Sequence, residues 1–537
     1  MSPLLDLPAE LIDHILSYVT PLDLVSVSWT CRLLHEHCLT DSLWHPHVNA
    51  NLPNPLSSPS PYPSFRALYT AHHPYWFLTR HQLWFADTPH TGKLLLARYS
   101  PQRACIEAYS LNAERGAHTF QFWEHDREVI IHTFHPTVTL DLNAPVLKLD
   151  SAAYFRAELL RNQLASDGSS AGMPSKLQLE IPMSTYSNSR MAHGGAALYS
   201  QFMLTRPLPP HLISRGTAVW PPLVVPSPGP EGGERTRNES VQLYRGISHK
   251  PERWDEASQT TWRLRRWMEF TSRGHDPLGI NLRVGEDVTT FGTLDMSAYT
   301  PTKSKPWQGI WVGDYSGHGC EFLVVLQPDE EEVRKGKRPL PQQAAVLLRE
   351  MEERDRWQRR EMGEEEEIPV AQSNLLLPEP SDVLPSDSAY HVVNVPDDDG
   401  GEEVALMELL AAPHHVETPL RFTSEDEPAD ADDDAYRGRI EAVKLTGDPN
   451  IPRGEYTFIA PDIGPAGLVR VATEEMFRGA RVVRSVGHIA ARGFREDGYT
   501  PSQLILVSHD TLAQYWEAFG HISFYKRVDI KPLLKTE

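Results

Sequence analysis

The pattern of apolar and polar positions begins with three short helices in the first 48 residues. Pro8 suits the first turn of a helix, where its missing N–H has no partner to lose. Thr20 and Asp23, on either side of Pro21, form a second helix start, and a third short helix fits 41–45. The apolar positions that recur at helical spacing are Leu11, Ile15, Leu16, Val19, Leu24, Val27, Cys31 and Leu34.

These helices are too short to enclose their apolar side chains among themselves, so one face needs a partner. The stretch 4–48 resembles the F-box, the motif that binds Skp1 in SCF ubiquitin ligases. Leu7-Pro8, Ile15-Leu16, Pro21 to Leu24 and Leu43-Trp44 stand in the order and spacing of that family. Trp29 departs from the usual pattern before Cys31-Arg32, and an ordinary N-terminal helical hairpin is the alternative. The resemblance implies Skp1 contacts at Leu7, Pro8, Leu11, Ile15, Leu16, Leu22, Leu24, Val27, Leu43 and Trp44.

From Phe65 the pattern changes to short β-branched and aromatic runs separated by turn residues, after a semi-rigid, Pro-rich linker at 49–64. Regular short strands with tight turns favour an antiparallel sheet or barrel. The predicted strands of this part are 76–78, 82–85, 93–99, 105–111, 119–123, 129–134, 138–142, 145–149 and 197–204.

Strands resume after Tyr436, at 439–445, 454–459, 468–473, 482–491, 503–507 and 522–527. Between the last two, Ser508 is predicted to cap a helix that contains Leu512 and Trp516 and ends at Gly520. Because strands stand on both sides of 327–435, we expect one β-rich domain made of 65–326 and 436–537, to which the resemblance described below assigns substrate binding.

The interrupting stretch, 327–435, is strongly acidic. It holds 30 Asp and Glu against 10 Lys and Arg, and so carries 20 of the 21 net negative charges of the chain. Such a composition predicts a largely disordered insertion, or a solvated helix over about 342–362. Whether it binds a basic partner stays open, and an overall basic footprint for nucleic acid is absent. The predicted fold class is therefore α+β: a three-helix F-box, a large antiparallel β-barrel-like domain and a disordered acidic insertion.

Three stretches of the β region resemble the cyclin D1-binding type of F-box protein, that of F-box only protein 31 and its fungal relatives. They are 84–109, 307–326 and 487–528, with anchors at 93–99, 313–321 and 519–525. The resemblance implies a β-barrel-like receptor that captures an extended peptide tail of a substrate, as the substrate-recognition adaptor of an SCF ligase. Animal members of the family carry a Cys/His zinc cluster. This chain has no cysteine between Cys105 and Cys320, so we expect no metal and no cofactor.

A glycine-rich turn within 306–326 is the strongest local signal for a substrate site. Trp307, Trp311 and Tyr315 offer rigid aromatic area of the kind that dominates binding hot spots. His318 adds hydrogen-bonding groups, and the neighbouring glycines leave backbone N–H groups open to a terminal carboxylate or amide. Arg492, on a neighbouring predicted strand, could face an acidic tail. The alternative is that both tryptophans belong to the barrel core and the glycines only make a hairpin.

An enzyme fused to an F-box, such as a hydrolase, is the main functional alternative. Glu124-His125-Asp126 and Ser508-His509-Asp510 are its candidate groups, but neither has a nucleophile, a base and an orienting group at a recognised spacing. A metal-dependent structural domain is a further alternative, based on the adjacent pairs His72-His73 and His414-His415. We therefore predict a non-catalytic subunit.

The four cysteines form no C-x-x-C pair, so a reducing compartment is expected. No run of 18 apolar residues predicts a membrane span, and the N-terminus has no signal-peptide pattern. We expect a cytoplasmic or nuclear protein that binds neither membrane nor nucleic acid.

Overall fold

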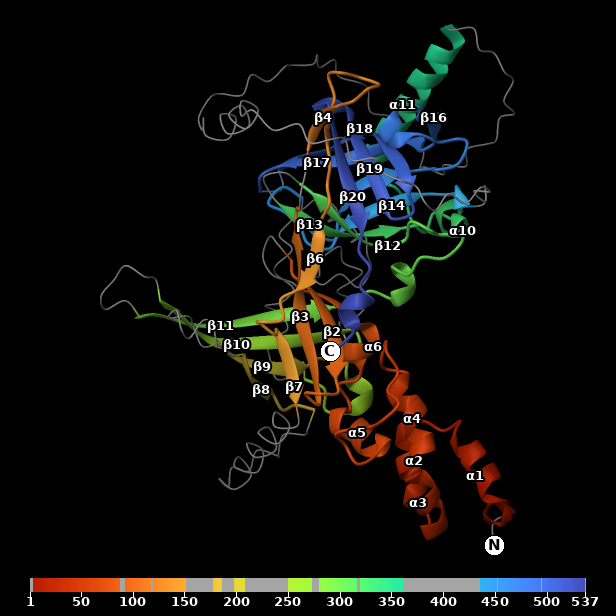
Figure 1. The fold of residues 1–537 in the computed structure, drawn as a ribbon, viewed down its shortest axis with the longest axis vertical. Helices are drawn as coiled ribbons and strands as arrows, with labels where there is room; N and C mark the ends of the chain where they lie inside the picture. Colours follow the sequence, from red (N-terminus) through yellow and green to blue (C-terminus); the bar gives the residue numbers. More distant parts are fainter. Residues whose placement is uncertain are drawn as a thin grey trace, which may run out of the picture.

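The computed structural model describes residues 3–86, 92–116, 119–150, 177–185, 198–207, 250–272, 280–315, 319–361, 435–451, 453–493 and 495–536. Along the longest axis of the molecule, the N-terminal helices lie at one end, a barrel at the other and a second sheet between them (Figure 1). None of the described helices is long and apolar enough to cross a membrane.

The N-terminal region holds four helices where the sequence predicted three: α1 (Ala9–Leu16), α2 (Pro21–Ser28), α3 (Arg32–Cys38) and α4 (Asp41–Asn49). The predicted cap of α2 is confirmed, because the Thr20 hydroxyl accepts the Asp23 backbone N–H. The continuous helix expected through Leu34 is interrupted, since Cys31 is extended (φ −158°) and starts α3 as its N-cap. The last of the four, α4, is fixed by Trp44, whose ring N–H donates to the Cys38 carbonyl at 2.7 Å.

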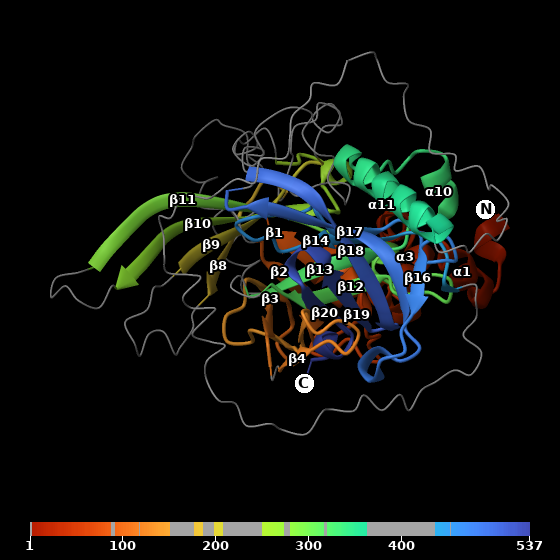
Figure 2. The same cartoon turned by 90° about the horizontal axis from the view of Figure 1, so that it is seen from above.

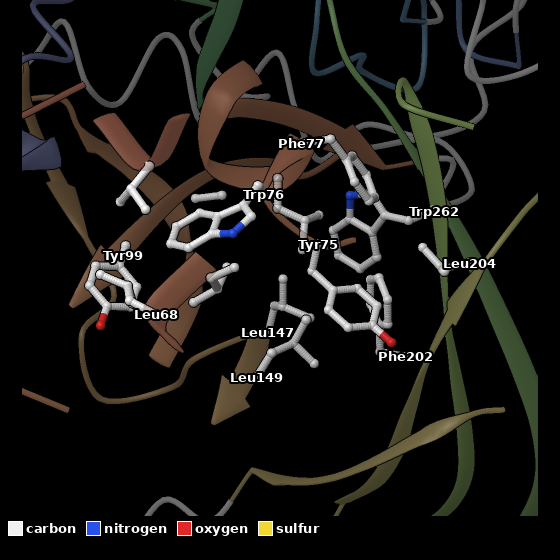
Figure 3. Close-up of a cluster of buried hydrophobic side chains, with 14 of the residues drawn as sticks. Leu68, Tyr75, Trp76, Phe77, Tyr99, Leu147, Leu149, Phe202, Leu204 and Trp262 are labelled. Carbon is white, nitrogen blue, oxygen red and sulfur yellow. The ribbon is translucent and has the colours of Figure 1, made fainter. Parts of the chain in front are cut away.

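Two more helices connect this region to the sheets, α5 (Phe65–His72) and α6 (Phe77–His81). The strand predicted at 76–78 is therefore wrong. An apolar run of three residues has no periodicity that separates a strand from a buried helix turn. Here Trp76, Phe77 and Leu78 are all buried in the core that joins the helices to the sheet. Figure 3 shows Trp76 and Phe77 in this core.

The middle sheet has nine strands in the order β6-β3-β2-β1-β11-β10-β9-β8, with β7 beside β3. One face packs on the helices through Trp84, Leu95 and Trp262. The other face packs on the barrel through Leu83, Phe85 and Leu94. The strands are β1 (Leu83–Ala86), β2 (Leu94–Ser100), β3 (Cys105–Glu114), β6 (Thr137–Leu140), β7 (Leu147–Asp150), β8 (Ile181–Thr185), β9 (Leu198–Leu204), β10 (Thr261–Ser272) and β11 (Ile280–Gly292).

The barrel is a closed antiparallel ring of eight strands, because its first strand, β12, also pairs with its last, β20. Its strands are β12 (Gly309–Asp314), β13 (Cys320–Leu326), β14 (Ile440–Lys444), β15 (Tyr456–Ala460), β17 (Arg481–Ala491), β18 (Arg495–Ser508), β19 (Thr511–Trp516) and β20 (His521–Arg527). Three short strands extend the sheet: β16 (Leu468–Val471) beside β17, and the pair β4 (Phe120–Phe122) and β5 (Ile130–His132) beside β20. The predicted β-barrel-like architecture is confirmed.

The helix predicted after Ser508 is wrong, since residues 511–516 form strand β19. Leu512 and Gln514 alternate with Ala513, and β19 hydrogen-bonds to β18 on one side and β20 on the other. The hydrogen bonds that β19 makes with a strand on each side outweigh the helix-cap signal at Ser508, because tertiary contacts routinely override intrinsic helix propensity.

The beginning of the acidic insertion packs on the barrel. After the short α10 (Glu330–Arg334), helix α11 (Gln342–Glu361) lies against β17 and β18 (Figure 2). Ala344, Leu348 and Met351 are buried against Ile459 and Val486. The predicted helix is thus present but is not solvated on all sides. The disorder predicted over 362–434 lies outside the described residues.

Candidate functional site

The first candidate site is the solvent-facing side of α1. Leu7 stands just before the helix, and Leu11 and Ile15 follow at intervals of four residues, so the three share one helical face. They are 36%, 48% and 42% exposed, while Ile12 and Leu16 on the opposite face are buried. Tyr18, which follows α1, is also exposed and places its hydroxyl by His14. This face of α1 is apolar and has no cover among the described residues.

The same pattern continues on α2. Leu22 and Trp29 are seven residues apart and therefore lie on one side of the helix, opposite the buried Leu24 and Ser28. Trp29 is 82% exposed. Together, Leu7, Leu11, Ile15, Tyr18, Leu22 and Trp29 are called the outer apolar set below. The sequence missed Tyr18 and Trp29 as site residues, although Trp29 was visible as a departure from the F-box pattern.

Four of the residues predicted to contact Skp1 lie in the protein core instead. Leu16, Leu24, Leu43 and Trp44 are at most 5% exposed. They join the cluster that fastens the N-terminal helices to one another and to the middle sheet. Pro8 is exposed and Val27 half-buried. The buried four therefore shape the helices that carry the outer apolar set and do not themselves form an open surface.

The second candidate site is the barrel interior, which has an apolar half and a polar half. Trp307 and Trp311 belong to the apolar half and are fully buried with Leu323, Phe458 and Leu504. Their ring N–H groups are satisfied internally, that of Trp307 by the Ser508 carbonyl and that of Trp311 by the Trp307 carbonyl. The predicted role of these two tryptophans in a substrate site is therefore wrong for the folded state, because closure of the barrel encloses them.

The polar half lies towards the strand ends at Asp314, Cys320 and Lys444, and we call it the polar end. Its centre is the Lys444 ammonium, which lies 2.9 Å from a Glu321 carboxylate oxygen and also pairs with Asp448. All three side chains are buried. Burial raises the pKa of Glu321 to about 8, although Lys444 opposes this shift. For Asp448 the attraction of Lys444 and backbone N–H bonds outweigh burial, so its pKa is lowered.

Tyr315 covers this charged group. Its ring lies over the Lys444 ammonium at 4.1 Å, and its hydroxyl is 2.9 Å from that of Thr457. Gly313 allows the arrangement, because a Cβ there would stand 2.5 Å from the ring of Tyr525. Tyr315 is partly buried, at the border between the polar end and the glycine-rich turn.

The other predicted residues of this site differ in position. Arg492 is exposed in the turn between β17 and β18 and not on a strand. That turn is tied to the loop of Asp448, since the Gly493 N–H donates to the Pro449 carbonyl at 2.9 Å. Arg492 is thus at the rim of the polar end. His318 lies outside the described residues.

A second buried polar group lines the opposite wall of the polar end. The Gln514 amide nitrogen donates to the hydroxyls of Ser485 and Ser502, which are 2.9 Å apart. All three side chains are completely buried. Sequence analysis missed this group and the Glu321–Lys444–Asp448 group. Side chains along a strand point alternately to its two faces, so these two polar groups could be recognised in the sequence only if the face that turns into the barrel were already known.

The groups weighed for catalysis are not assembled as a catalytic site. Ser508 donates to Asp510, but His509 lies edge-on against Trp307. His125 is exposed and lies near the Trp123 ring. His72 is buried beside the Tyr62 hydroxyl, and burial lowers its pKa to about 3. Among the described residues no group of three or more His, Cys, Asp and Glu is placed to hold a metal, and His414-His415 lies outside them.

Two parts of the chain match family models. Residues 4–49 match the F-box-like family, and residues 291–532 match the Cyclin D1 binding domain. No curated protein matches the chain. The first match covers the helices with the outer apolar set, and the second covers the whole barrel, including the polar end.

Proposed function

Because this chain is an F-box protein of the cyclin D1-binding type, we propose that it binds Skp1 through the outer apolar set and a substrate peptide through the polar end of the barrel. An F-box gives a protein the general role of substrate-recognition adaptor in an SCF ligase, and such proteins are typically non-catalytic subunits. In this role the chain itself needs no cofactor, because ubiquitin transfer is performed by other subunits.

The observation that carries the Skp1 proposal is the exposure of large apolar side chains on α1 and α2. Leu11, Ile15 and Trp29 leave 48%, 42% and 82% of their surface in solvent. Contiguous apolar surface of this kind marks an interaction site on a soluble protein. The buried side of the same helices is rigidly packed, so the exposed side is presented in a fixed geometry.

The arrangement of the molecule supports separate ends for ligase and substrate. The four N-terminal helices stand at one end of the longest axis, and the middle sheet separates them from the barrel (Figure 1). The helices and the sheet share one apolar core, in which Leu68 and Trp76 contact the sheet. A substrate on the barrel is then held at a fixed distance from Skp1.

The peptide proposal rests on the polar end. Tyr315 and the rim residue Arg492 flank a buried group with both charge signs, Glu321, Lys444 and Asp448. Barrel mouths with convergent polar groups are common ligand sites. The exposed guanidinium of Arg492 at the rim favours a peptide end that carries a carboxylate or a carbonyl oxygen.

The Skp1 arm is tested by pull-down and calorimetry with purified Skp1. Replacing Leu7 and Pro8 together with Ala, or Leu11 with Asp, should abolish Skp1 binding, because an apolar contact is lost or a charge is desolvated without a partner. The matched control is Val346→Asp on α11, an exposed apolar residue outside the F-box. Unchanged Skp1 binding in the Leu7/Pro8 and Leu11 variants would contradict the proposal.

The substrate arm is tested by comparing the proteins that co-purify with wild type and with a Tyr315→Ala, Arg492→Ala variant, while the proteasome is blocked. We expect the variant to keep Skp1 and to lose specific substrates. A folded variant that retains every substrate would place the peptide site elsewhere.

The same role implies a cytoplasmic or nuclear location, with which the four free cysteines agree. Fluorescence microscopy of the tagged chain tests this location.

A further inference from the structure

The β4–β5 hairpin continues the inner face of the barrel beyond its polar end. Strand β20 pairs with β12 up to Tyr525 and with β5 at residues 521–523. Because side chains alternate along a strand, Ser523 and His521 share the inward face of Tyr525. In the paired strands, Ser523 lies beside His132 and His132 beside Phe120. His521 likewise lies beside Ile130, and Ile130 beside Phe122, so these residues share the same face of the sheet.

This continued face ends in an aromatic surface, formed by Phe120, Phe122 and Phe519 and called the aromatic ledge. These side chains are 50%, 72% and 61% exposed. Phe519 adjoins the hairpin, because the carbonyl of the next residue, Gly520, accepts the Ile130 N–H at 2.8 Å. Phe120 and Phe122 share one face of the hairpin by its register, and Phe519 comes two residues before His521, which lies on that face. Exposed apolar side chains gathered on one part of a surface mark an interaction site, and these lie next to the proposed peptide site.

The ledge is held rigidly from below. Trp123 is 2% exposed, and its ring N–H donates to Glu474 at 3.1 Å. Phe120 stacks on the His132 ring with a centroid distance of 4.6 Å. Arg115 reaches Asp314 at 2.6 Å, and Asp314 lies 3.7 Å from His132, which ties the hairpin to β12. A preformed aromatic surface loses little entropy when a ligand covers it.

Acidic side chains lie beside the aromatic ledge, on the side that is farther from the polar end. Glu124, Asp126 and Glu128 are exposed on the turn between β4 and β5, where Arg127 and His125 also stand. Glu517 stands two residues before Phe519. A peptide that leaves the polar end across the ledge would therefore pass apolar rings first and acidic side chains next.

We propose that the aromatic ledge binds the segment of a substrate tail that precedes its end, and that it selects apolar side chains followed, further from the end, by a basic one. This proposal rests on the proposed peptide site at the polar end and adds a sequence preference to it. The recognised partner is an extended peptide of that chemistry.

The test is a selection from a library of randomised peptides, made with free and with amidated carboxyl termini, on the full-length chain. Wild type should enrich apolar residues near the peptide end and Lys or Arg further upstream. Phe122→Ser with Phe519→Ser should lose the apolar preference, and Glu124→Gln with Asp126→Asn and Glu128→Gln should lose only the basic one. The control is Val469→Ser with Val471→Ser, which removes two apolar residues on β16 that are 45% and 51% exposed.

The outcomes separate the two proposals. If the ledge variant selects the same peptides as wild type while Tyr315→Ala loses them, the ledge proposal is overturned and the polar end stands. If wild type enriches no peptide feature at all, the peptide part of the proposed function fails and the ledge proposal falls with it. For selected peptides, we expect the ledge variant to bind about tenfold more weakly in fluorescence polarisation.

Discussion

One tryptophan of the N-terminal helices, Trp29, and one of the barrel, Trp311, lie in opposite environments. Trp29 is 82% exposed at the end of α2, whereas Trp311 is completely buried inside the barrel. In the sequence, both rings are large aromatic groups of the kind that dominates binding hot spots. The difference lies in what surrounds them: eight closed strands enclose Trp311, but four short helices cannot enclose both faces of α1 and α2.

This comparison shows how a surplus of apolar surface identifies a docking site. In the barrel, the apolar residues are satisfied by the fold itself, and buried polar groups such as Glu321 and Lys444 mark the end at which we propose the peptide site. In the F-box the reverse holds: its polar residues do not indicate a site, whereas its exposed apolar residues indicate a binding partner. The predictions below contrast these two environments, in order of their expected effect on stability.

Truncation of the enclosed tryptophan should have the largest effect. Trp311→Ala removes a fully buried ring and leaves the Trp307 carbonyl without its donor at 2.9 Å. We expect the free energy of unfolding to fall by about 3–5 kcal/mol. Denaturant unfolding measures this loss, with Trp357→Ala, 59% exposed on α11, as the control. An unchanged midpoint for Trp311→Ala would mean that the barrel interior is open and not packed.

Helix α11 should contribute the next largest share. Leu348 is 4% exposed against the barrel, while Val346 on the same helix is 48% exposed. Leu348→Ala should therefore lower the free energy of unfolding by about 2–4 kcal/mol, and Val346→Ala should change it by less than about 0.5 kcal/mol. Equal effects of the two substitutions in thermal unfolding would show that the helix does not pack as described.

The case of α11 also shows what the sequence could predict. Its helical periodicity was readable, but its charge suggested a solvated helix. The stripe of Ala344, Leu348 and Met351 finds its partners, Ile459 and Val486, more than a hundred residues later. Contacts between residues so far apart in the sequence cannot be read from a local pattern of apolar positions. The same holds for Trp307 and Trp311, which alternation places on one face without saying that the face turns inward.

The local signals were more reliable where one segment determines its own structure. The Thr20 cap, the strands on both sides of the insertion and the glycine-rich turn between β12 and β13 follow from neighbouring residues. The polar end could not be predicted, because Glu321, Lys444 and Gln514 come from three different parts of the chain and meet only when the barrel closes. Tyr315 could be proposed from the sequence because it borders a glycine-rich segment that the sequence shows directly.

The buried carboxyl of the polar end should give stability a pH dependence. Burial raises the pKa of Glu321 from 4.5 to about 8 in the folded protein. Between these values the folded state keeps a proton that the unfolded state releases, so stability should fall as pH rises through this window. Glu321→Gln should flatten this part of the profile in denaturant unfolding across the window. A slope that is identical in wild type and variant would contradict the protonation of Glu321.

Truncation of the exposed tryptophan should have the smallest effect on stability and a clear effect on binding. Trp29 contacts little of its own protein, so Trp29→Ala should change the free energy of unfolding by less than about 0.5 kcal/mol. Exposed tryptophans at interfaces are frequent hot spots, and we expect Skp1 affinity to fall by about 2 kcal/mol. Calorimetric titration with Skp1 measures this loss, and Trp357→Ala, which removes an exposed tryptophan on α11, should leave the affinity unchanged.

If Trp29→Ala binds Skp1 as tightly as wild type, Trp29 lies outside the interface and the outer apolar set reduces to Leu7, Leu11, Ile15, Tyr18 and Leu22. If it instead unfolds the protein, the ring is part of the core, and the contrast with Trp311 is lost.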